Sequence, residues 1–382
     1  MDLPAAPLLP QILDRIKAAA SAAAPLRIRG GGSKDFYGQS LQGEILDTTG
    51  LTGITSYEPS ELVVTVRAGT PLAELEAVLA EENQCLPFEP PHFKAGTTVG
   101  GMVAAGLSGP SRASSGGVRD FMLGVSMVNG KAEQLTFGGQ VMKNVAGYDV
   151  SRLMAGSLGT LGLITEVSLK VLPIAPAEAT LKFEYPQAEA IKRLNVWLGH
   201  PLPLHASCWL EDGGVPSLYV RLRGAVAAVH AAVQRMGGEL QDEHSGHPAV
   251  ATVAARWRAL RDQTLPFFKL QPGESLWRLS VPDTTPDLEL EELGQTLVEW
   301  HGAQRWVKVS MQDPASAALR LRERVHAVGG SATLFVASQA DNAAAIPVFS
   351  PLKPPLDRIH RDLKRQFDPA GIFNRGRMFA DM

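Results

Sequence analysis

A run of three glycines is the first candidate for chemistry in this chain. Gly30, Gly31 and Gly32 lie between Arg29 and Ser33, directly after a strand-like segment. Because glycine has no Cβ, the backbone can curl there until several N–H groups point at one spot, and such a nest binds phosphate. The alternative is a plain flexible turn, which is the more common outcome for a short glycine motif on its own. The loop therefore needs support from a second segment.

A second segment of small residues supplies that support. Thr97, Thr98, Gly100 and Gly101 combine hydroxyl groups with bare backbone, and residues 104–109 continue the run of small side chains. Hydroxyls and free N–H groups hydrogen-bond a pyrophosphate, and small residues let a long ligand lie against the main chain. No Gly-x-Gly-x-x-Gly motif opens a helix, so the Rossmann route to a dinucleotide is absent.

Metal and iron–sulfur chemistry lack ligands in this sequence. The two cysteines, Cys85 and Cys208, are too few for an iron–sulfur cluster, so any such cluster must come from another subunit. We expect them to be reduced, with a single disulfide as the alternative. The histidines are scattered except for His244 and His247 in a polar loop, and two histidines fall short of the three or four ligands that a metal requires. We predict no metal site.

Charge and hydropathy exclude other classes. The 36 basic and 39 acidic residues give a net charge of −3, which leaves no positive field for a nucleic-acid partner. No apolar run reaches the roughly 18 to 20 residues needed to span a bilayer. Residues 8–24 carry Asp14, Arg15 and Lys17, which favours a surface helix over a signal peptide. The sequence predicts a cytoplasmic protein, with contact to the inner face of the cytoplasmic membrane left open.

The elements that must position these loops differ between the two halves of the chain. In the first half of the chain, glycine turns separate short alternating strands, as at residues 26–29, 61–67 and 163–171. After the linker at residues 173–176, strand-like and helical patterns alternate, which predicts an α+β unit with helices packed on an antiparallel sheet. Strands are predicted at residues 206–210, 218–222, 276–281, 305–309 and 333–336, and helices at 225–236, 288–300, 315–328 and 356–366.

An ordered set of short motifs resembles one domain family. The motifs are residues 29–33, 66–69, 90–91, 97–101, 118–120, 143–149 and 156–165, together with the tail at 367–377. They are similar to the PCMH-type FAD-binding domain shared by vanillyl-alcohol oxidase, the bacterial reductase of UDP-acetylenolpyruvoylglucosamine, and D-lactate and glycolate dehydrogenases. Residues 32–38, 88–93 and 138–143 resemble more closely the FAD-binding subunits, called E subunits, of bacterial glycolate oxidases.

The resemblance implies a domain plan and a cofactor. An N-terminal helix would occupy residues 1–24, a two-lobed PCMH-type FAD-binding domain 25–176, an α+β cap domain with an antiparallel sheet 177–346, and a tail returning to the FAD-binding domain 347–382. FAD would be noncovalent. Covalent members of the family carry a histidine in the phosphate loop or a cysteine near the second loop, whereas Lys34 and Asp35 follow Ser33 here and Cys85 lies outside the matching segment.

The resemblance also assigns contacts to FAD. The two glycine-rich segments would hold the pyrophosphate, Ile164 would lie along the adenine, Arg119 and Asp120 beside the ribityl chain, and Asn374 near the flavin ring. The predicted FAD-binding residues are Arg29, Gly30, Gly31, Gly32, Ser33, Pro91, Thr97, Thr98, Gly100, Gly101, Ala105, Gly106, Arg119, Asp120, Lys143, Gly147, Tyr148, Gly159, Ile164 and Asn374.

The activity implied by the resemblance is the oxidation of a small 2-hydroxy acid. In the family, glycolate is oxidised to glyoxylate by a complex of this kind of subunit with a larger flavoprotein subunit and an iron–sulfur subunit, and electrons pass to a membrane acceptor. The chain would relay electrons in such a complex, with glycolate or D-lactate as the substrate. Peripheral membrane association through the complex is left open.

Catalytic residues are harder to assign. The larger subunits carry metal-binding His-x-Gly-Asp-Gly-Asn-x-His and Gly-Glu-His-Gly patterns, and neither occurs here. Oxidation of a 2-hydroxy acid by a flavin needs a base for the hydroxyl proton and a cation for the carboxylate. His92 and Arg377 are the candidates for these roles. The alternatives are that His92 bonds only a backbone carbonyl and that Arg377 is a surface residue.

Two other functions remain as alternatives. One is a self-sufficient FAD-dependent dehydrogenase of a 2-hydroxy acid or an alcohol. The other is a non-catalytic scaffold subunit that keeps the fold but no longer uses the flavin.

Overall fold

The computed structural model describes residues 8–39, 41–139, 148–241, 253–310, 314–338 and 346–382. The chain divides into two compact units. The first comprises Met1–Leu107, Gly117–Pro173 and Pro351–Met382, and the second comprises Ser108–Gly116 and Ile174–Ser350. Both units combine helices with sheets, so the α+β class is confirmed.

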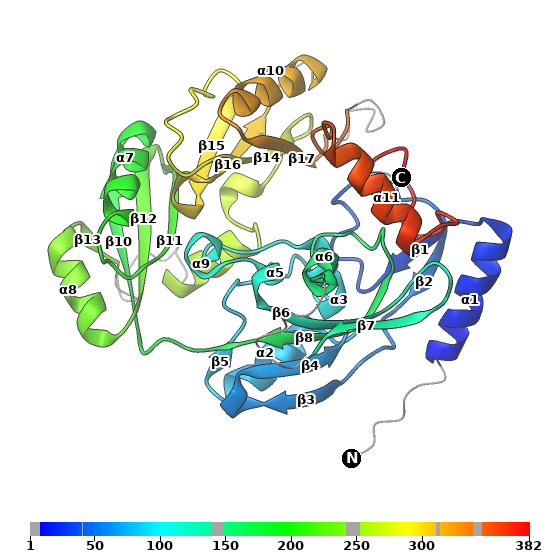
Figure 1. Cartoon of the computed structure of the whole chain (residues 1–382). Helices are drawn as coiled ribbons and strands as arrows, with labels where there is room; N and C mark the ends of the chain where they lie inside the picture. Colours follow the sequence, from blue (N-terminus) through cyan, green and yellow to red (C-terminus); the bar gives the residue numbers. More distant parts are fainter. Residues whose placement is uncertain (1–7, 40, 140–147, 242–252, 311–313, 339–345) are drawn as a thin grey trace. The chain divides into compact units, whose positions relative to one another are not determined.

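The first unit is built around a five-stranded antiparallel sheet (Figure 1). In spatial order its strands are β3 (Ile54–Glu58), β4 (Val63–Arg67), β8 (Leu163–Lys170), β6 (Met122–Val128) and β7 (Gln134–Gly138). Helices α2 (Leu72–Glu81) and α3 (Val99–Ala105) share a hydrophobic core with this sheet. Leu72, Leu75 and Leu79 supply the buried stripe of α2 at helical spacing, which fixes the helix against the strands.

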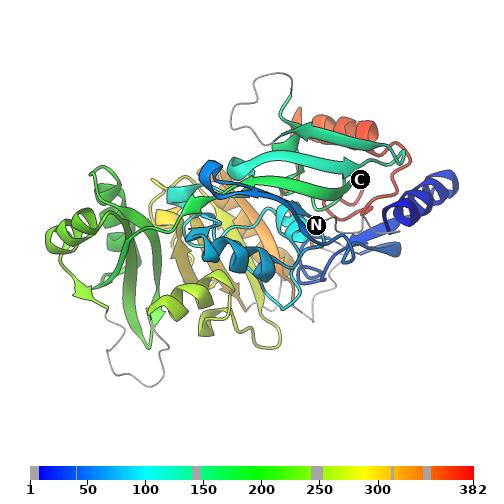
Figure 2. The ribbon, with the colours of Figure 1, turned by 90° about the horizontal axis from the view of Figure 1, so that it is seen from below.

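A second core of the first unit lies under the N-terminal helix. Strands β1 (Leu26–Arg29) and β2 (Glu44–Asp47) form a parallel pair, and helix α1 (Leu8–Ala22) lies beside them in Figures 1 and 2. The buried Ile12 and Ile16 of α1 pack with Leu26, and also with Phe373 from the far end of the chain. Phe373 forms a bridge to Leu26, so the C-terminal tail after α11 (Leu356–Phe367) runs alongside β1.

Smaller elements complete the first unit. They are the 3-10 turn η1 (Pro59–Glu61), the strand pair β5 (Gln84–Cys85) and β9 (Leu172–Pro173), and helices α5 (Val118–Phe121) and α6 (Val150–Met154).

The second unit contains an eight-stranded antiparallel sheet (Figure 1). Its spatial order is β13 (Glu239–Leu240), β10 (Ala177–Glu184), β12 (Val215–Gly224), β11 (Leu204–Asp212), β15 (Gly294–Glu299), β16 (Gln304–Val309), β14 (Ser275–Ser280) and β17 (Ser331–Val336). Helices α7 (Gln187–Leu198) and α8 (Val226–Met236) pack on the part around β10 and β12. Helix α10 (Pro314–Ala327) packs on the part around β14 and β17. Helix α9 (Val253–Arg261) and the turns η2 (Pro266–Phe268) and η3 (Trp300–Gly302) complete the unit.

The helix predicted at residues 288–300 is wrong. Residues 294–299 form strand β15 in the interior of the sheet, paired with β11 on one side and with β16 on the other. The leucines at 290, 293 and 297 have helical spacing and are buried, but ladder bonds on both sides of β15 override that pattern.

Residues 108–116 also depart from the predicted domain plan, which placed them in the FAD-binding domain. They belong to the second unit, where α4 (Arg112–Ser115) contacts β11 and η3. The indole Nε1 of Trp300 donates to the carbonyl of Gly109 at 3.0 Å, and the Arg112 guanidinium lies 4.7 Å from the centre of the Trp300 ring. These contacts within the second unit account for the assignment.

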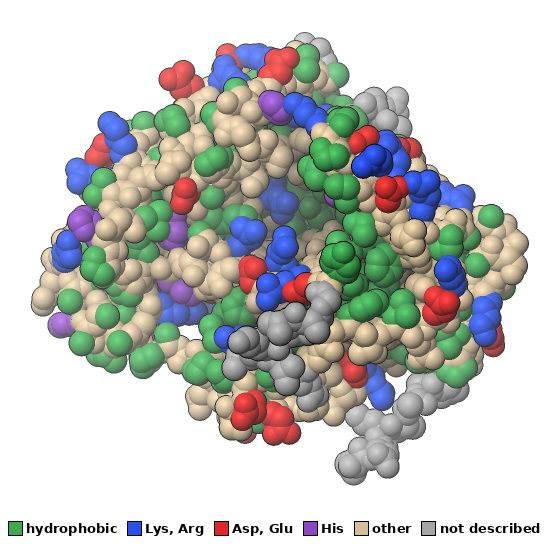
Figure 3. Space-filling view, viewed as in Figure 1, with side chains coloured by type: hydrophobic (Ala, Val, Ile, Leu, Met, Phe, Trp, Pro, Cys, Tyr) green, Lys and Arg blue, Asp and Glu red, His purple; other side chains and the backbone are tan. Residues whose placement is uncertain are grey.

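Charged side chains of both signs are interspersed over the face seen in Figure 3. Helix α11 is an example, since Arg361 forms ion pairs with Asp357 and Asp381. Among the described residues, no helix combines the length and the apolar character that a membrane crossing requires.

Candidate cofactor site

The glycine loop after β1 is pressed against residues 96–98. A Cβ on Gly31 would lie 1.7 Å from the carbonyl oxygen of Gly96, and one on Gly30 would lie 2.3 Å from Oγ1 of Thr98. Gly32 has a φ of +67°, in the left-handed region that favours glycine. No side chain fits at Gly30 or Gly31 without displacing its neighbours, so the main chain itself forms this wall.

The backbone N–H groups of this loop remain available. Within the described residues, those of Gly30, Gly31, Gly32 and Ser33 donate to no protein acceptor. Thr98 caps α3 and accepts a hydrogen bond from the N–H of Gly101 at 3.3 Å. The two glycine-rich segments thus meet as one surface of donors and bare backbone.

Asn374 joins the walls of the site. Its Oδ1 accepts from the N–H of Ile28 at 2.7 Å, and its Nδ2 donates to the carbonyl of Leu158 at 2.6 Å. Gly159 has a φ of +71°, and a Cβ there would lie 2.7 Å from Asn374 Nδ2. Nearby in sequence, the buried Oγ of Ser157 has no hydrogen-bond partner in the described part of the chain.

A buried ion pair fixes the segment that carries Asn374. Lys364 Nζ donates to Asp368 Oδ2 and to the carbonyls of Thr160 and Phe373, each at 2.7 Å. Lys364 is 5% exposed and Asp368 is 1% exposed. Burial lowers the pKa of Lys364, although the charge of Asp368 opposes this shift. Asp368 also accepts from the N–H groups of Ile372 and Phe373, at 3.0 and 2.8 Å.

The sequence reasoning missed this pair. Its only signal is a lysine and an aspartate four residues apart, which a solvated helix surface displays equally well.

Arg377 is buried, so the alternative that it lies on the surface is wrong. Its Nη1 donates to the carbonyl of Gln39 at 2.9 Å, and its Nη2 donates to those of Lys34 and Asp35 at 3.0 and 3.1 Å. Burial lowers its pKa to about 10. The guanidinium therefore holds the loop that follows the glycines.

The walls enclose a narrow, positively charged groove of about 120 Å³. Four cationic side chains line it against one carboxylate: Arg27, Arg29, Lys34 and Arg377 against Asp35. Asp35 Oδ2 accepts from Arg27 at 2.6 Å and from Arg29 at 2.9 Å. Burial raises the pKa of Asp35, but these two arginines outweigh it and the pKa lies below its usual value. The balance suits an anionic group.

Most of the predicted FAD-binding residues come together in this groove. Those that line it are Arg29, Gly30, Gly31, Gly32, Ser33, Thr98, Gly100, Gly101, Ala105, Gly159, Ile164 and Asn374. Arg377, predicted as a carboxylate clamp, lines it too. Sequence reasoning missed Arg27, Ile28 and Thr48; only the first two had a signal, their place in the strand that leads into the glycine loop.

Other predicted residues do not line the groove. Thr97 uses its Oγ1 to donate to the carbonyls of His92 and Lys94, so it shapes the loop behind the groove. Gly106 ends α3 in the left-handed conformation, and Pro91 is buried.

The remaining predicted contacts lie elsewhere. Arg119 and Asp120 are exposed, and Asp120 Oδ2 accepts from the N–H of Gly117 at 2.8 Å. Tyr148 is 97% exposed. Lys143 and Gly147 lie outside the described residues.

His92 lies outside the groove lining as well. Its Nε2 is 2.8 Å from Glu76 Oε2, so the side chain pairs with a carboxylate rather than only with a backbone carbonyl. Neither catalytic candidate is thus an uncommitted base or clamp inside the groove.

In the described part of the chain, no three His, Cys, Asp or Glu side chains are grouped to hold a metal ion. Cys85 and Cys208 form no disulfide with each other, and His244 and His247 lie outside the described residues.

Comparison with known proteins identifies the class. The family described as "FAD binding domain" matches residues 9–150, which include both glycine-rich segments of the groove. Together with the α+β fold, this match defines the chain as an FAD-binding flavoprotein, an oxidoreductase by class.

Similarity to individual proteins defines the family more narrowly. The chain is 43% identical to "Glycolate oxidase subunit GlcE" of Escherichia coli (strain K12) over 372 residues, which cover 97% of each protein. The chain belongs to the glycolate oxidase subunit GlcE family. "D-lactate dehydrogenase" of Anaerostipes hadrus is 33% identical over 38% of this chain and 30% of its own length.

A solved structure supports the fold alone. "Alkyldihydroxyacetonephosphate synthase in P212121" aligns with a TM-score of 0.64 at 14% identity, over 96% of this chain and 74% of that one.

Proposed function

We propose that the chain is the FAD-binding subunit of a glycolate oxidase complex and binds FAD noncovalently in the groove of the first unit. The first unit would be the FAD-binding domain and the second unit the cap domain. When bound, FAD supplies the two-electron acceptor for oxidation of a 2-hydroxy acid.

The groove carries the cofactor part of this proposal. Free backbone N–H groups at Gly30–Ser33 and an excess of cationic side chains suit the two negative charges of a diphosphate. Gly30, Gly31 and Gly159 leave no room for a Cβ, because Thr98, Gly96 and Asn374 pack closely against them and hold the walls of the groove together. Asn374 and Arg377 would keep the walls in place.

The substrate part rests on the relatives. Two of them are named for glycolate and D-lactate, which are both small 2-hydroxy acids. We assign glycolate to this chain because the match to glycolate oxidase subunit GlcE spans 97% of both proteins, whereas the match to the D-lactate dehydrogenase spans 38% of this chain.

The proposal of partner proteins rests on the names of two relatives, which are both called subunits of glycolate oxidase. Glycolate oxidase subunit GlcD of Bacillus subtilis (strain 168) is 30% identical over 36% of this chain, so two related subunits carry the name of one enzyme. We propose a larger flavoprotein subunit and an iron–sulfur subunit as partners, with the complex at the inner face of the cytoplasmic membrane.

A relay role is favoured over independent turnover. His92 pairs with Glu76 outside the groove, and Arg377 donates to backbone carbonyls of the loop after the glycines. Substrate oxidation therefore would take place in the partner flavoprotein, and this subunit would pass electrons on.

The test is an anaerobic reduction experiment. The chain is purified alone, its visible spectrum is recorded, and glycolate is added without oxygen while the flavin band is followed. We expect a flavin spectrum that glycolate leaves unbleached until the larger flavoprotein subunit is added.

The other outcomes separate the alternatives. Rapid bleaching of the lone chain would overturn the relay role and favour the self-sufficient dehydrogenase. A chain that takes up no added FAD would overturn the cofactor assignment and favour the scaffold.

A further inference from the structure

The eight-stranded sheet of the second unit opens between two of its central strands. The ladder between β11 and β15 contains three residue pairs, and Leu210 with Leu297 is the last of them. The next positions, Glu211 opposite Thr296 and Asp212 opposite Gln295, would continue the register but are not paired. On their other sides, β11 stays paired with β12 to Asp212 and β15 with β16 to Gly294. We call this opening the fork.

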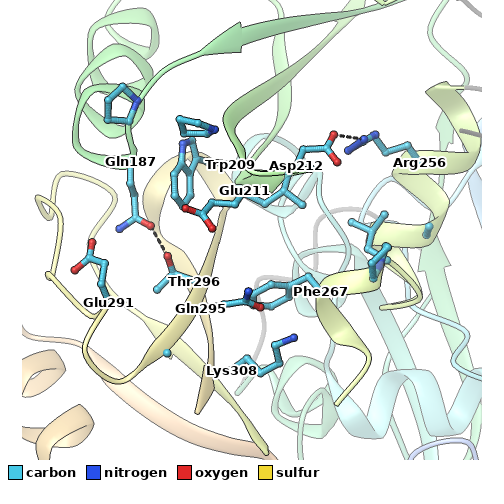
Figure 4. Close-up of a pocket in the computed structure, with 18 of the residues that line it drawn as sticks. Gln187, Trp209, Glu211, Asp212, Arg256, Phe267, Glu291, Gln295, Thr296 and Lys308 are labelled. Atoms are coloured by element: carbon cyan, nitrogen blue, oxygen red, sulfur yellow. Dashed lines mark hydrogen bonds and ion pairs between the residues drawn. The ribbon is translucent and has the colours of Figure 1, made fainter. Parts of the chain in front are cut away.

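A large cavity fills the fork. Its volume is about 1170 Å³, and the unpaired ends of both strands line it together with α9, η2 and the loop before β15. Figure 4 shows Trp209 and Glu211 on the β11 side, Gln295 and Thr296 on the β15 side, and Phe267 facing them from η2. The volume exceeds the range of about 300 to 1,000 Å³ that is typical of small-molecule sites.

The charge of the fork is negative, and its cations are engaged. Four carboxylates line it, from Glu211, Asp212, Asp287 and Glu291, against two cations, Arg256 and Lys308. Arg256 Nη2 pairs with Asp212 Oδ2 at 2.5 Å, and Lys308 Nζ lies 5.6 Å from the centre of the Phe267 ring.

Two of the four carboxylates remain unused. Asp287 accepts from Gln187 Nε2 at 2.5 Å, and Gln187 accepts from Thr296 Oγ1 at 2.6 Å. Glu211 and Glu291 are exposed and form no ion pair or side-chain hydrogen bond with the described residues.

We propose that the fork is a docking site for an extended, basic segment of a partner protein, which adds as a strand to the free edge of β15. The backbone groups of Gly294–Thr296 that are left free would pair with the segment, as unpaired strand edges do in strand-addition complexes; the Gly294 N–H is not among them, because it donates to the carbonyl of Leu290 at 3.2 Å. Successive side chains of a strand point to opposite faces. A basic residue would reach Glu211 or Glu291, while apolar residues pack near Trp209 and Phe267.

Charge and shape select this occupant over others. An acidic segment would meet four carboxylates, and a helix would not pair with the free backbone groups of the strand edge. The inference stands apart from the proposed flavin chemistry, because every residue that carries it belongs to the second unit.

The experiment uses the full chain with FAD and three labelled peptides. The first alternates lysine and valine, the second alternates glutamate and valine, and the third is the lysine peptide with every second backbone nitrogen methylated. Binding is followed by fluorescence anisotropy at low and at physiological salt. Hydrogen exchange of residues 211–213 and 294–296 locates the site.

Only the lysine peptide is expected to bind, and it should slow exchange at residues 294–296. The double variant Glu211→Gln, Glu291→Gln should weaken its binding about 10-fold, since two charge pairs are lost. The matched control is Glu81→Gln, Glu239→Gln, which removes the same charge from two exposed positions outside the fork and should leave binding unchanged.

Four results would overturn the proposal. They are the absence of binding by the lysine peptide, equal loss in both double variants, equal binding of the methylated peptide, and protection confined to amides outside the fork. Equal loss would indicate nonspecific attraction to net charge, and equal binding of the methylated peptide would exclude strand addition.

Discussion

The groove of the first unit and the fork of the second unit differ in what lines them and in the sign of their charge. The groove is narrow, about 120 Å³, and four cations face one carboxylate across walls made largely of main chain. The fork holds about 1170 Å³ and is lined by four carboxylates and two cations. Main-chain walls fix the position of each N–H and suit one rigid anion, whereas exposed side chains adapt to a polypeptide that varies.

The rigidity of the groove depends on the buried Lys364. Lys364→Met would remove the three hydrogen bonds of Nζ and leave the Asp368 carboxylate buried without its cation. Breaking such a pair costs about 3–5 kcal/mol of unfolding free energy. Denaturant unfolding measures this loss, and the affinity for FAD should fall with it because Asn374 follows the same segment.

The adjacent Arg365 provides the control. Its side chain is 72% exposed and pairs with Asp362 at the surface, so Arg365→Met should cost at most about 1 kcal/mol. Equal losses in the two variants would show that Lys364 does not lock the groove.

How well the sequence predicts a region depends on how far apart along the chain its contacting residues lie. The glycines at 30–32 and 100–101 can be recognised from the sequence, because the residue type alone shows that these positions have no side chain. The role of Lys364 is not visible, since its partners Thr160 and Phe373 become neighbours only through folding.

The fork was beyond sequence reasoning for the same cause. Residues 288–300 have the spacing of a helix, and only the strands on either side of residues 294–299 make them β15. The fork exists only because β15 separates from β11. Since residues 288–300 were predicted as a helix, the sequence could not predict the cavity between these two strands.

The two ends of β15 differ in burial: one end lines the open fork and the other end leads to a buried histidine. At its first residues β15 is not paired with β11 and lines the fork. At its other end β15 is paired with β11 and leads into η3, where His301 is 2% exposed. His301 has a φ of +56° and lies between two hydroxyls, with Ser207 Oγ 3.1 Å from Nδ1 and Ser114 Oγ 3.0 Å from Nε2. Burial lowers its pKa from 6.5 to about 4, although the charge of Asp283 opposes this shift.

Because of this low pKa, we expect the stability of the fold around His301 to fall in acid. Between pH 6.5 and 4 the unfolded chain binds a proton at this histidine that the folded chain does not, so the free energy of unfolding falls as the pH falls. The loss reaches about 3 kcal/mol near pH 4. Denaturant unfolding at several pH values measures it in the wild type and in His301→Asn, because asparagine tolerates the left-handed conformation.

The variant should lose that part of the acid dependence. His230→Asn, at an exposed position on α8, should keep all of it. An unchanged slope in His301→Asn would mean that the buried imidazole is not the source.

The main-chain wall of the groove can be tested at Gly31. Gly31→Ala places a Cβ against the carbonyl of Gly96, so the loop must move away and carry the free N–H groups of residues 30–33 with it. We expect FAD affinity to fall about 100-fold, which corresponds to about 2.7 kcal/mol. Flavin content after purification and titration with FAD measure the change, and circular dichroism verifies that the chain is folded.

Two further glycine variants calibrate this result. A Cβ at Gly139 has no atom of the described residues within 4 Å, so Gly139→Ala should bind FAD as the wild type does. Gly30→Ala clashes with the side chain of Thr98, which can rotate, so its loss should lie between the other two. Equal affinity in all three would contradict a wall built from backbone.

The smallest effect is expected at the unpaired acids of the fork. Glu211→Gln and Glu291→Gln should change the free energy of unfolding by less than about 0.5 kcal/mol, because neither side chain has a partner among the described residues. Asp212→Asn is the contrast in the same cavity. Asp212 accepts from Arg256 and from the Tyr219 hydroxyl, each at 2.5 Å, so its loss should cost about 1.5–3 kcal/mol. Denaturant unfolding of the three variants decides the point: a large cost at Glu211 or Glu291 would make these acids structural and remove the reason to expect a basic partner.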